Sequence, residues 1–328
     1  MTVKPRACVI GAGAWGTALA NQLALTAKVC LVARNEQRVG EILSRGESPR
    51  LPQVPIREDI MVDSLPDEHA SIWCYARPYA FLDEFLAQYE NIIRERAISF
   101  VIASKGISAA GELATDLWEK YGVSQNGLML SGPSFAKDLA SGKPVAVALA
   151  GHSDQRASSV AEYFHNGCMR IYPGDDPRGV AFAGAVKNVM ALACGIVSGA
   201  QLGQSAMAAV AARGFAEMLK LCDALHIEPK TLMGLAGFGD LFLTASSMQS
   251  RNMQFGRLLG EGFPPDEAAQ QVFGFIEGRM SVPGVVRLGN RAGVQMPIVH
   301  GIDALLAEQV TITQLVDGLL ARPMSKQF

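Results

Sequence analysis

The residue with the clearest capacity for chemistry is Lys187, because it stands in the middle of an almost entirely apolar stretch, residues 179–203. Ala, Leu and Met favour a helix there, and the many Gly and Ala residues let neighbouring elements approach closely. An ammonium group in apolar surroundings loses hydration, and desolvation lowers the pKa of a lysine. The stretch therefore predicts one of two arrangements. Either the stem of Lys187 packs while its head reaches solvent, or the side chain gives and takes a proton near neutral pH.

A glycine-rich turn at the start of the chain is typical of dinucleotide binding. Residues 7–10 form a short apolar run, which leads into Gly11, Gly13 and Gly16 and then into a helical pattern over 17–24. In this fingerprint the first glycine permits a tight turn and the second lets backbone approach a pyrophosphate. The third lets the helix pack on the strand. The pyrophosphate would lie at the helix N-terminus, where N–H groups and the helix dipole favour an anion.

The choice of dinucleotide depends on the residue after the second predicted strand, 29–33. Arg34 stands there instead of the Asp or Glu that would bind the ribose 2′-hydroxyl of NAD. An arginine can accommodate the 2′-phosphate of NADP, although Glu36 complicates the choice. Arg34 could also be a solvated residue at a strand end. The sequence predicts that NADPH is accepted.

Two further predicted strands end in polar residues. Residues 98–103 lead into Lys105, and residues 128–130 lead into a loop with Gly132 and Ser134. The carboxyl ends of strands border the crevice in which doubly wound sheets bind ligands. Taken alone, each loop could equally be an ordinary turn.

A polar insertion, residues 237–252, interrupts the apolar second half of the chain. Ser250 is positioned to cap a helix whose first turn contains Arg251 and Asn252. Arginine at a helix start conflicts with the dipole unless an anion lies there, and a guanidinium matches a phosphate well. The alternative is a solvated, capped loop.

The order of these patterns predicts an α/β fold: an N-terminal Rossmann-type doubly wound sheet followed by an all-helical C-terminal domain. Strand-like runs become scarce after about residue 180. We therefore expect a dinucleotide-binding domain over residues 1–180 and a helical substrate-binding domain over residues 181–328. The helices predicted for the second domain are 180–197, 205–225, 264–276, 283–292 and 298–320.

Composition excludes several classes of function. The chain has 328 residues, of which 49% are hydrophobic and 18% charged, and a net charge of −2. These values predict a soluble globular protein without the basic excess of a nucleic-acid binder. The apolar runs beside Lys187 are shorter than the ~20 residues of a membrane span, so no stable membrane insertion is expected, and the first residues have no signal-peptide pattern. Six cysteines without a CxxC pair and five histidines without a metal motif predict buried thiols, a reducing cytoplasm and no metal site.

Five motifs, taken together, resemble a known family. GAGAWGTALA, SKG, SGPSFA, GAVKNVMALACG and GFGDLFLT…SSMQSRN occur in this order. The set closely resembles the NAD(P)-dependent glycerol-3-phosphate dehydrogenases of bacteria, essentially from end to end. The resemblance implies a Rossmann-type domain, a helical substrate domain and a homodimer. It also implies the reversible reduction of dihydroxyacetone phosphate to sn-glycerol 3-phosphate by NADPH or NADH, with a product that feeds phospholipid synthesis.

The resemblance also assigns roles by position. Lys187 matches an acid/base lysine, which would protonate the carbonyl oxygen as hydride reaches C2 and remove the hydroxyl proton in reverse. Lys105 matches a second lysine that would polarise the carbonyl, and Asp240 would hold a substrate hydroxyl or orient Lys187. The other matches are the substrate positions Gly132, Ser134, Ser250, Arg251 and Asn252, and the cofactor positions Gly11, Gly13, Ala14, Trp15, Gly16, Arg34, Lys105, Ala136, Arg251 and Glu277.

Three positions depart from the family pattern. Ala14 stands where Ser or Thr is common, Arg50 stands where an aromatic residue is usual, and residues 75–78 read Tyr-Ala-Arg-Pro after the third strand of the family pattern. These departures concern contacts with the cofactor and leave the proposed proton transfer untouched.

Two other classes of protein compete with this interpretation. A β-hydroxyacid dehydrogenase also has a lysine on a helix that enters its second domain, but it has no need of a phosphate contact at Arg251. A catalytically silent redox sensor would keep the three glycines, but it has no reason to keep Lys105, Lys187 and Asp240.

Overall fold

The computed structural model describes residues 4–321 and separates into two compact units. The first, which we call the sheet unit, contains the described residues of Met1–Gly106, Glu112–Gly184 and Lys230–Asp240. The second, the helical unit, contains those of Ile107–Gly111, Ala185–Pro229 and Leu241–Phe328.

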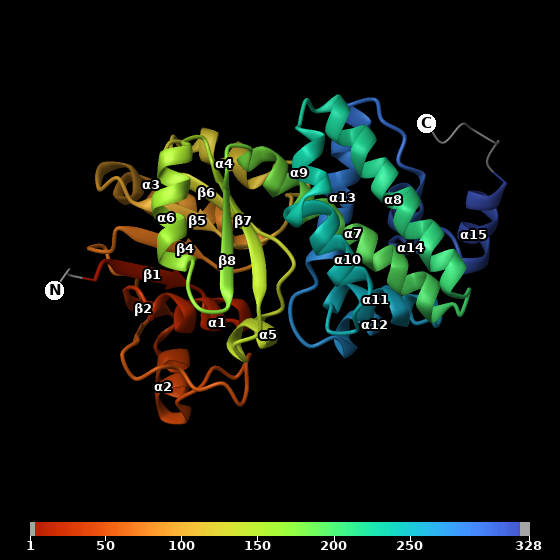
Figure 1. Cartoon of the computed structure of the whole chain (residues 1–328). Coiled ribbons are helices and arrows are strands. Elements are labelled where there is room, and N and C mark those ends of the chain that lie inside the picture. The colour runs from red at the N-terminus through yellow and green to blue at the C-terminus, as the bar shows by residue number, and fades with distance from the viewer. Residues whose placement is uncertain (1–3, 322–328) are drawn as a thin grey trace. The chain divides into compact units, whose positions relative to one another are not determined.

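An eight-stranded sheet forms the centre of the sheet unit, and most of its strands are labelled in Figure 1. The strand order is β3-β2-β1-β4-β5-β6-β7-β8. Neighbouring strands are parallel except β6 and β7, which are antiparallel. The order reverses between β1 and β4, the position where doubly wound sheets bind ligands. The predicted fold class is therefore confirmed. The strands are β1 Arg6–Ile10, β2 Lys28–Val32, β3 Met61–Asp63, β4 Ile72–Tyr75, β5 Ser99–Ile102, β6 Gly127–Ser131, β7 Val145–Gly151 and β8 Met169–Gly174.

Side chains alternate between the two faces of this sheet, and different helices cover each face. On one face, Val9 and Leu31 belong to a core cluster that α1 and α6 help to cover. On the other face, rings from β4 and β5 pack against α3; the rings of Phe85 and Phe100 are stacked with centroids 5.8 Å apart. The helices of this part of the chain are α1 Ala14–Leu23, α2 Glu36–Arg45, η1 Tyr79–Phe81, α3 Leu82–Glu95, α4 Ala114–Lys120, α5 Ala136–Ala140 and α6 Asp154–Phe164.

The rest of the described chain is helical, as the sequence predicted, but three helix boundaries differ. Predicted helix 264–276 ends at Gln271, before Gly274, whose φ is +113°. Predicted helix 283–292 begins earlier and includes Pro283, although proline removes a backbone hydrogen bond inside a helix. Predicted helix 298–320 is two helices, because the chain turns at Glu308 with φ +55°. These helices are α7 Pro177–Gly199, α8 Gln204–Ala224, α9 Pro229–Met233, the π-helical turn η2 Leu235–Gly239, α10 Asp240–Ala245, α11 Arg251–Gly260, α12 Pro265–Gln271, α13 Glu277–Arg291, α14 Pro297–Leu306 and α15 Ile312–Leu320.

Helices α7 and α11 pack backbone against backbone in the helical unit. A Cβ placed on Gly199 would lie 1.9 Å from the carbonyl oxygen of Arg257, and one on Gly256 would lie 2.2 Å from that of Leu192. Only glycine permits such an approach, so the small residues noted in the sequence do bring neighbouring helices close together. Two more glycines, Gly195 and Gly260, contribute to this contact.

Helix α7 has the length and hydropathy of a membrane span, and within residues 4–321 it is the one helix that does. Its apolar window is completely buried inside the protein, as in the core helix of a soluble protein. Because these side chains are buried, the apolar sequence of α7 is not exposed to water.

Candidate active site

The glycine turn has the geometry that a pyrophosphate requires. Gly11 has φ +121°, and its N–H donates to the carbonyl of Val32 at 2.9 Å. Apart from Gly13 and its two chain neighbours, no described residue has an atom within 4 Å of a Cβ placed on Gly13. A Cβ on Gly16 would lie 1.9 Å from the carbonyl oxygen of Gly11. Gly13 also precedes α1 and supplies no side-chain cap to its first N–H groups. The loop therefore offers an open backbone surface and uncapped donors to an anion.

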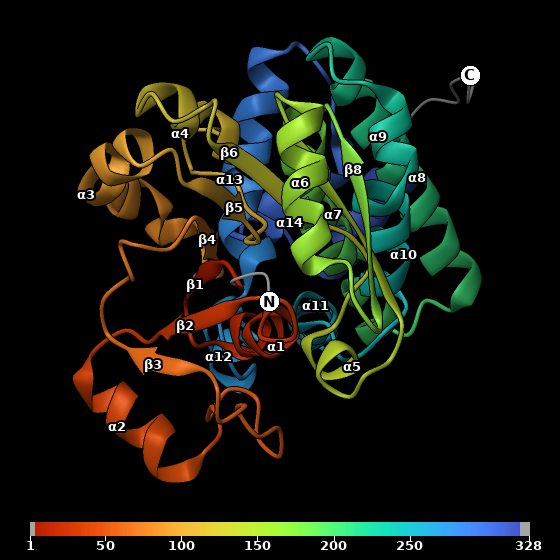
Figure 2. The same ribbon diagram turned by 60° about the vertical axis from the view of Figure 1, so that its left-hand side comes forward.

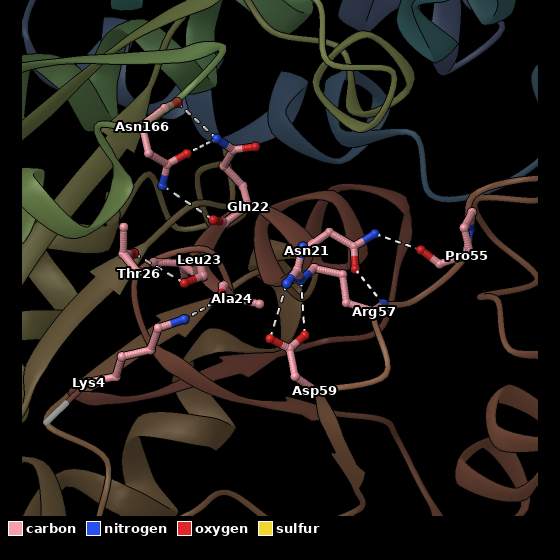
Figure 3. A network of polar contacts seen from close by, with 10 residues as sticks. All are labelled: Lys4, Asn21, Gln22, Leu23, Ala24, Thr26, Pro55, Arg57, Asp59 and Asn166. Carbon is pink, nitrogen blue, oxygen red and sulfur yellow. Dashed lines mark hydrogen bonds and ion pairs between the residues drawn. The ribbon is translucent and has the colours of Figure 1, made fainter. Parts of the chain in front are cut away.

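Helix α1, which presents this loop, is anchored at its other end by polar contacts (Figure 3). Gln22 Nε2 donates to the carbonyl and to the side-chain oxygen of Asn166. The neighbouring Asn21 donates to the carbonyl of Pro55 at 2.9 Å and accepts from the N–H of Arg57 at 3.2 Å. These bonds hold the C-terminal half of α1 to two loops and so fix the position of its N-terminus.

The residues after β2 lie at the β3 edge of the sheet, where α2 begins (Figure 2). Arg34 is exposed there, and no ion pair within the described residues involves it. Glu36 is the first residue of α2, and its carboxylate accepts a hydrogen bond from the hydroxyl of Ser64. An acid at a helix N-terminus is stabilised by the dipole, so Glu36 has favourable partners other than Arg34.

A partly buried ion pair lies at the carboxyl edge of the sheet. Lys105 follows β5, and its Nζ lies 2.6 Å from Oδ2 of Asp240 and 3.2 Å from the carbonyl oxygen of Gly132. Asp240 is only 2% exposed. Gly132 has φ +156°, and a Cβ there would lie 2.8 Å from the Cα of Val147. The absence of a side chain at Gly132 lets this loop approach β7 closely. In this position the carbonyl oxygen of Gly132 faces Nζ of Lys105.

The π-helical turn η2 positions Asp240. A Cβ on Gly237 would lie 1.9 Å from the carbonyl oxygen of Leu232, and the N–H of Gly239 donates to the carbonyl of Gly234 at 3.1 Å. The segment predicted as a polar insertion is therefore largely ordered helix. The turn ends directly before Asp240, and π-helical turns, which are rare, occur often at functional sites.

Lys187 is buried in the helical unit, and very little of its surface is exposed to solvent. It is 5% exposed, and its Nζ donates to Oγ1 of Thr244 at 2.7 Å. Val186 and Val189 beside it on α7 are completely buried. Of the two predicted arrangements, the snorkelling lysine is wrong.

Asn252 connects three helices of the helical unit. Its Nδ2 donates to Oδ1 of Asn188, one residue after Lys187, at 2.9 Å, and its Oδ1 accepts from the N–H of Gly278 at 2.9 Å. All three residues are buried. This network fixes the start of α11 relative to the middle of α7 and the start of α13.

The start of α11 is as the sequence predicted. Ser250 Oγ accepts a hydrogen bond from the N–H of Met253 at 3.3 Å, and Arg251 is the first helical residue. Arg251 is exposed, and a Cβ on Gly274 would lie 3.2 Å from its Nη1. A larger residue at position 274 would therefore press on the guanidinium.

The remaining predicted positions are distributed over both units. In the sheet unit, Ala14 and Trp15 open α1, Ala136 opens α5, and Ser134 donates to the carbonyl of Gly132 at 3.2 Å. In the helical unit, Glu277 opens α13 and is partly exposed. Among residues 4–321, no three His, Cys, Asp or Glu side chains are arranged to hold a metal ion.

Sequence analysis gave no role to Thr244 or Asn188, although both hold side chains of the candidate site. One signal was available for Thr244, because it follows Asp240 by four residues and so lies on the same face of α10. No comparable signal pointed to the pairing of Asn188 with Asn252, which are far apart in the sequence.

A doubly wound sheet with a dinucleotide-binding glycine loop, followed by a helical unit that buries a lysine, defines a dinucleotide-dependent oxidoreductase. Two family models match the chain: the N-terminus of NAD-dependent glycerol-3-phosphate dehydrogenase over residues 6–157, and its C-terminus over residues 176–317. The chain is 39% identical to a glycerol-3-phosphate dehydrogenase [NAD(P)+] of Bradyrhizobium diazoefficiens, with 100% of both chains covered. It also resembles the crystal structure of glycerol-3-phosphate dehydrogenase from Coxiella burnetii, with a TM-score of 0.90, 33% identity and coverage of 97% of this chain and 99% of that one. The chain therefore belongs to the family of NAD(P)-dependent glycerol-3-phosphate dehydrogenases, and the resemblance read from its motifs is confirmed.

Proposed function

We propose that this protein reduces dihydroxyacetone phosphate to sn-glycerol 3-phosphate and catalyses the reverse oxidation, with Lys187 as general acid and base. The observation that carries the proposal is the burial of Lys187 in an apolar helix, with Thr244 as a hydrogen-bond acceptor for its Nζ. A buried amine is kept only where it is paired or used. Its relatives are named for this reaction.

The proton transfer follows from the chemistry of Lys187. In the direction of reduction its ammonium group gives a proton to the C2 oxygen as hydride arrives at C2. In the direction of oxidation the neutral amine removes the proton of the C2 hydroxyl. The contact with Thr244 limits the directions in which Nζ can point, so fewer orientations are lost when the substrate binds.

Lys105 supplies a second positive charge for the carbonyl. Asp240 orients Lys105 through the ion pair, and the carbonyl of Gly132 accepts a hydrogen bond from the same Nζ. A charge fixed before the reaction stabilises the negative charge that develops on the carbonyl oxygen without rearrangement. Gly132 and Ser134 contact the substrate.

Arg251 binds the substrate phosphate at the start of α11, where a guanidinium fork and the helix N-terminus both favour an anion. Ser250 shapes this helix start as its cap. Asn252 uses its Oδ1 and one Nδ2 hydrogen within the protein, so its second Nδ2 hydrogen is the donor it offers to the phosphate.

The dinucleotide binds along the carboxyl edge of the sheet, and when bound it supplies the hydride that reduces C2. Gly11, Gly13, Ala14, Trp15 and Gly16 form the loop under its pyrophosphate. Arg34 contacts the 2′-phosphate of NADP, which favours NADPH because Glu36 is held by Ser64. The other residues assigned to the cofactor are Lys105, Ala136, Arg251 and Glu277.

The remaining proposals concern the two domains, the location and oligomeric state of the protein, and the use of its product. Residues 1–180 bind the dinucleotide and residues 181–328 bind the substrate. The protein is a cytoplasmic homodimer, and its product supplies phospholipid synthesis.

The test is a spectrophotometric assay of purified protein with dihydroxyacetone phosphate and either NADPH or NADH, followed by the absorbance of the reduced nicotinamide. We expect oxidation of both cofactors, faster with NADPH at limiting concentration. Turnover of a 2- or 3-hydroxy acid in place of the phosphorylated substrate would assign the chain to a different reaction. Tight cofactor binding without turnover of any substrate would make it a sensor.

A further inference from the structure

A serine in the loop after α2 contacts the glycine turn. Ser48 is 0% exposed, and its Oγ donates a hydrogen bond to the carbonyl oxygen of Ala12 at 2.8 Å. Ala12 lies between Gly11 and Gly13, the first two glycines of the turn. Ser48 and Ala12 are 36 positions apart, so the contact depends on the folded chain and not on the local glycine pattern. Sequence analysis gave Ser48 no role.

The hydroxyl of Ser48 is used both as a donor and as an acceptor. Besides donating to Ala12, its Oγ accepts a hydrogen bond from the N–H of Arg50 at 3.3 Å. A serine hydroxyl has a single hydrogen, and the contact with Arg50 leaves that hydrogen for the carbonyl of Ala12. The contact uses the backbone of Arg50, so it does not depend on which side chain stands at this position.

Ser48 belongs to a loop that is closed on itself, residues 46–57, which we call the clamp loop. The N–H of Ile56 donates to the carbonyl of Gly46 at 2.8 Å and so joins the two ends. The N–H of Leu51 donates to the carbonyl of Ser48 at 2.9 Å, and the side chain of Leu51 is buried in the core of the sheet unit. A loop with joined ends and buried side chains of its own is compact, so it holds Ser48 in place.

The clamp loop also holds the other end of α1 (Figure 3). Asn21 Nδ2 donates to the carbonyl of Pro55 at 2.9 Å, and Asn21 Oδ1 accepts the N–H of Arg57 at 3.2 Å. The same loop therefore contacts the turn before α1, through Ser48 and Ala12, and the C-terminal half of α1, through Asn21. The glycine turn and the helix that follows it are fixed as one piece.

The contact with Ser48 sets the direction of the Gly13 N–H. The peptide bond between Ala12 and Gly13 is trans, so its C=O and its N–H point in opposite directions. Since Ser48 holds the C=O, the N–H is turned away from Ser48. No described residue accepts a hydrogen bond from this N–H, and a Cβ on Gly13 would meet only open space beyond its chain neighbours. The N–H is thus an unused donor at a helix start, where an anion is favoured.

We propose that Ser48 is a positioning residue for the pyrophosphate of the dinucleotide, because it orients the Gly13 N–H before the cofactor binds. A donor that is already oriented loses less freedom on binding. NADPH and NADH carry the same pyrophosphate, so Ser48 contributes equally to both, whereas Arg34 is assigned to the 2′-phosphate alone. This use of the donor rests on the dinucleotide role proposed above, but the contact between the clamp loop and the turn does not.

The first test is a fluorescence titration of the whole protein with NADPH and, separately, with NADH. Ser48→Ala should raise the Kd for both by the same factor, about 3- to 10-fold, as expected for one neutral hydrogen bond. The matched control is Ser44→Ala on α2, where an exposed serine donates to the carbonyl of Glu41 at 2.9 Å, and its Kd values should equal those of the wild type. Wild-type Kd values for Ser48→Ala, or a rise for NADPH alone, would overturn the proposal.

Ser48→Cys separates the hydrogen bond from the packing of the side chain. A thiol occupies a similar position but is a weak donor, so this variant should fold and should bind both dinucleotides as weakly as Ser48→Ala. It also provides the test if Ser48→Ala does not fold. Wild-type binding by Ser48→Cys would assign the effect to packing and overturn the proposal.

Hydrogen exchange measured by mass spectrometry tests the clamp loop without any ligand. Peptides that cover residues 11–16 should exchange faster in Ser48→Ala than in the wild type or in Ser44→Ala, because the turn has lost its contact with the loop. Unchanged exchange in these peptides would overturn the positioning role. A wild-type protein that binds neither dinucleotide would contradict the proposed function instead, and the exchange result would still decide whether Ser48 holds the turn.

Discussion

Replacing Glu217 by Gln should stabilise the protein at alkaline pH and have little effect at acid pH. Glu217 lies on α8 and is 6% exposed. Its Oε1 accepts the N–H of Ile298 at the start of α14 at 2.9 Å, and its Oε2 is buried without a hydrogen-bond partner among the described residues. Burial raises the pKa of this carboxyl from 4.5 to about 7, although the Ile298 and Val299 N–H groups, His300 and Arg213 act in the opposite direction.

The magnitude follows from that change in pKa. One pKa unit corresponds to about 1.4 kcal/mol, so ionised Glu217 costs the folded protein about 3 kcal/mol. Below pH 4.5 the carboxyl is protonated in both states and no cost arises. As the pH rises from 4.5 to about 7, the unfolded chain loses the proton first, so the free energy of unfolding falls. Above pH 7 the full cost applies. Glutamine keeps an oxygen for the Ile298 N–H and has no charge to bury.

Urea unfolding at about pH 5 and at about pH 8 measures this difference. The gain in unfolding free energy from Glu217→Gln should be larger at the higher pH by up to about 3 kcal/mol. Asp223→Asn, at an exposed carboxylate on the same helix, is the matched control and should show no such dependence. An equal effect of Glu217→Gln at both pH values would refute the account of a buried, protonated carboxyl.

Three further predictions concern the close helix contact and the two ligand sites. Gly256→Ala places a Cβ 2.2 Å from the carbonyl oxygen of Leu192 and should lower the stability measured by thermal unfolding by about 1–3 kcal/mol. The control, Gly318→Ala on α15, meets open space and should raise stability slightly. A Gly256→Ala protein as stable as the wild type would contradict the contact between α7 and α11. Arg251→Ala should raise the KM for dihydroxyacetone phosphate by about 10- to 100-fold, with a smaller effect on kcat. The control, Arg257→Ala on the same helix, breaks only the ion pair with Glu261 and should change neither constant. Equal effects of the two substitutions would argue against a phosphate site at Arg251. Arg34→Ala should raise the KM for NADPH and leave the KM for NADH nearly unchanged. The control is Arg45→Ala, at an arginine paired with Glu41. An equal rise in KM for both cofactors would exclude a contact between Arg34 and the 2′-phosphate.

The sequence predicted those parts of the fold and site that depend on local patterns. The glycine spacing predicted the turn, because the left-handed φ of Gly11 and the close approach at Gly16 are requirements of single positions. Ser250 was predicted as a cap for the same reason, since its partner is three residues away. The strands β1, β2 and β5 were predicted from short apolar runs.

Features that depend on distant parts of the chain could not be predicted in this way. The ion pair between Lys105 and Asp240 joins residues 135 positions apart, and no local pattern couples them. The edge strands β3 and β8 were missed because an edge strand is partly exposed and lacks the continuous apolar run of the central strands. Whether Lys187 reached solvent depended on the elements packed around α7, which the helix sequence alone does not specify.

The most direct test of the account is the rate of cofactor oxidation in a single turnover by Lys187→Ala, compared with wild type and with Lys220→Ala, a substitution at an exposed lysine of α8. The account predicts that Lys187→Ala binds NADPH with wild-type affinity but oxidises it about 10²-fold or more slowly in the presence of dihydroxyacetone phosphate, because the proton donor is missing. Lys220→Ala should behave as wild type. A Lys187→Ala protein that is folded, binds NADPH and turns over at the wild-type rate would contradict the assignment of Lys187 as the acid and base.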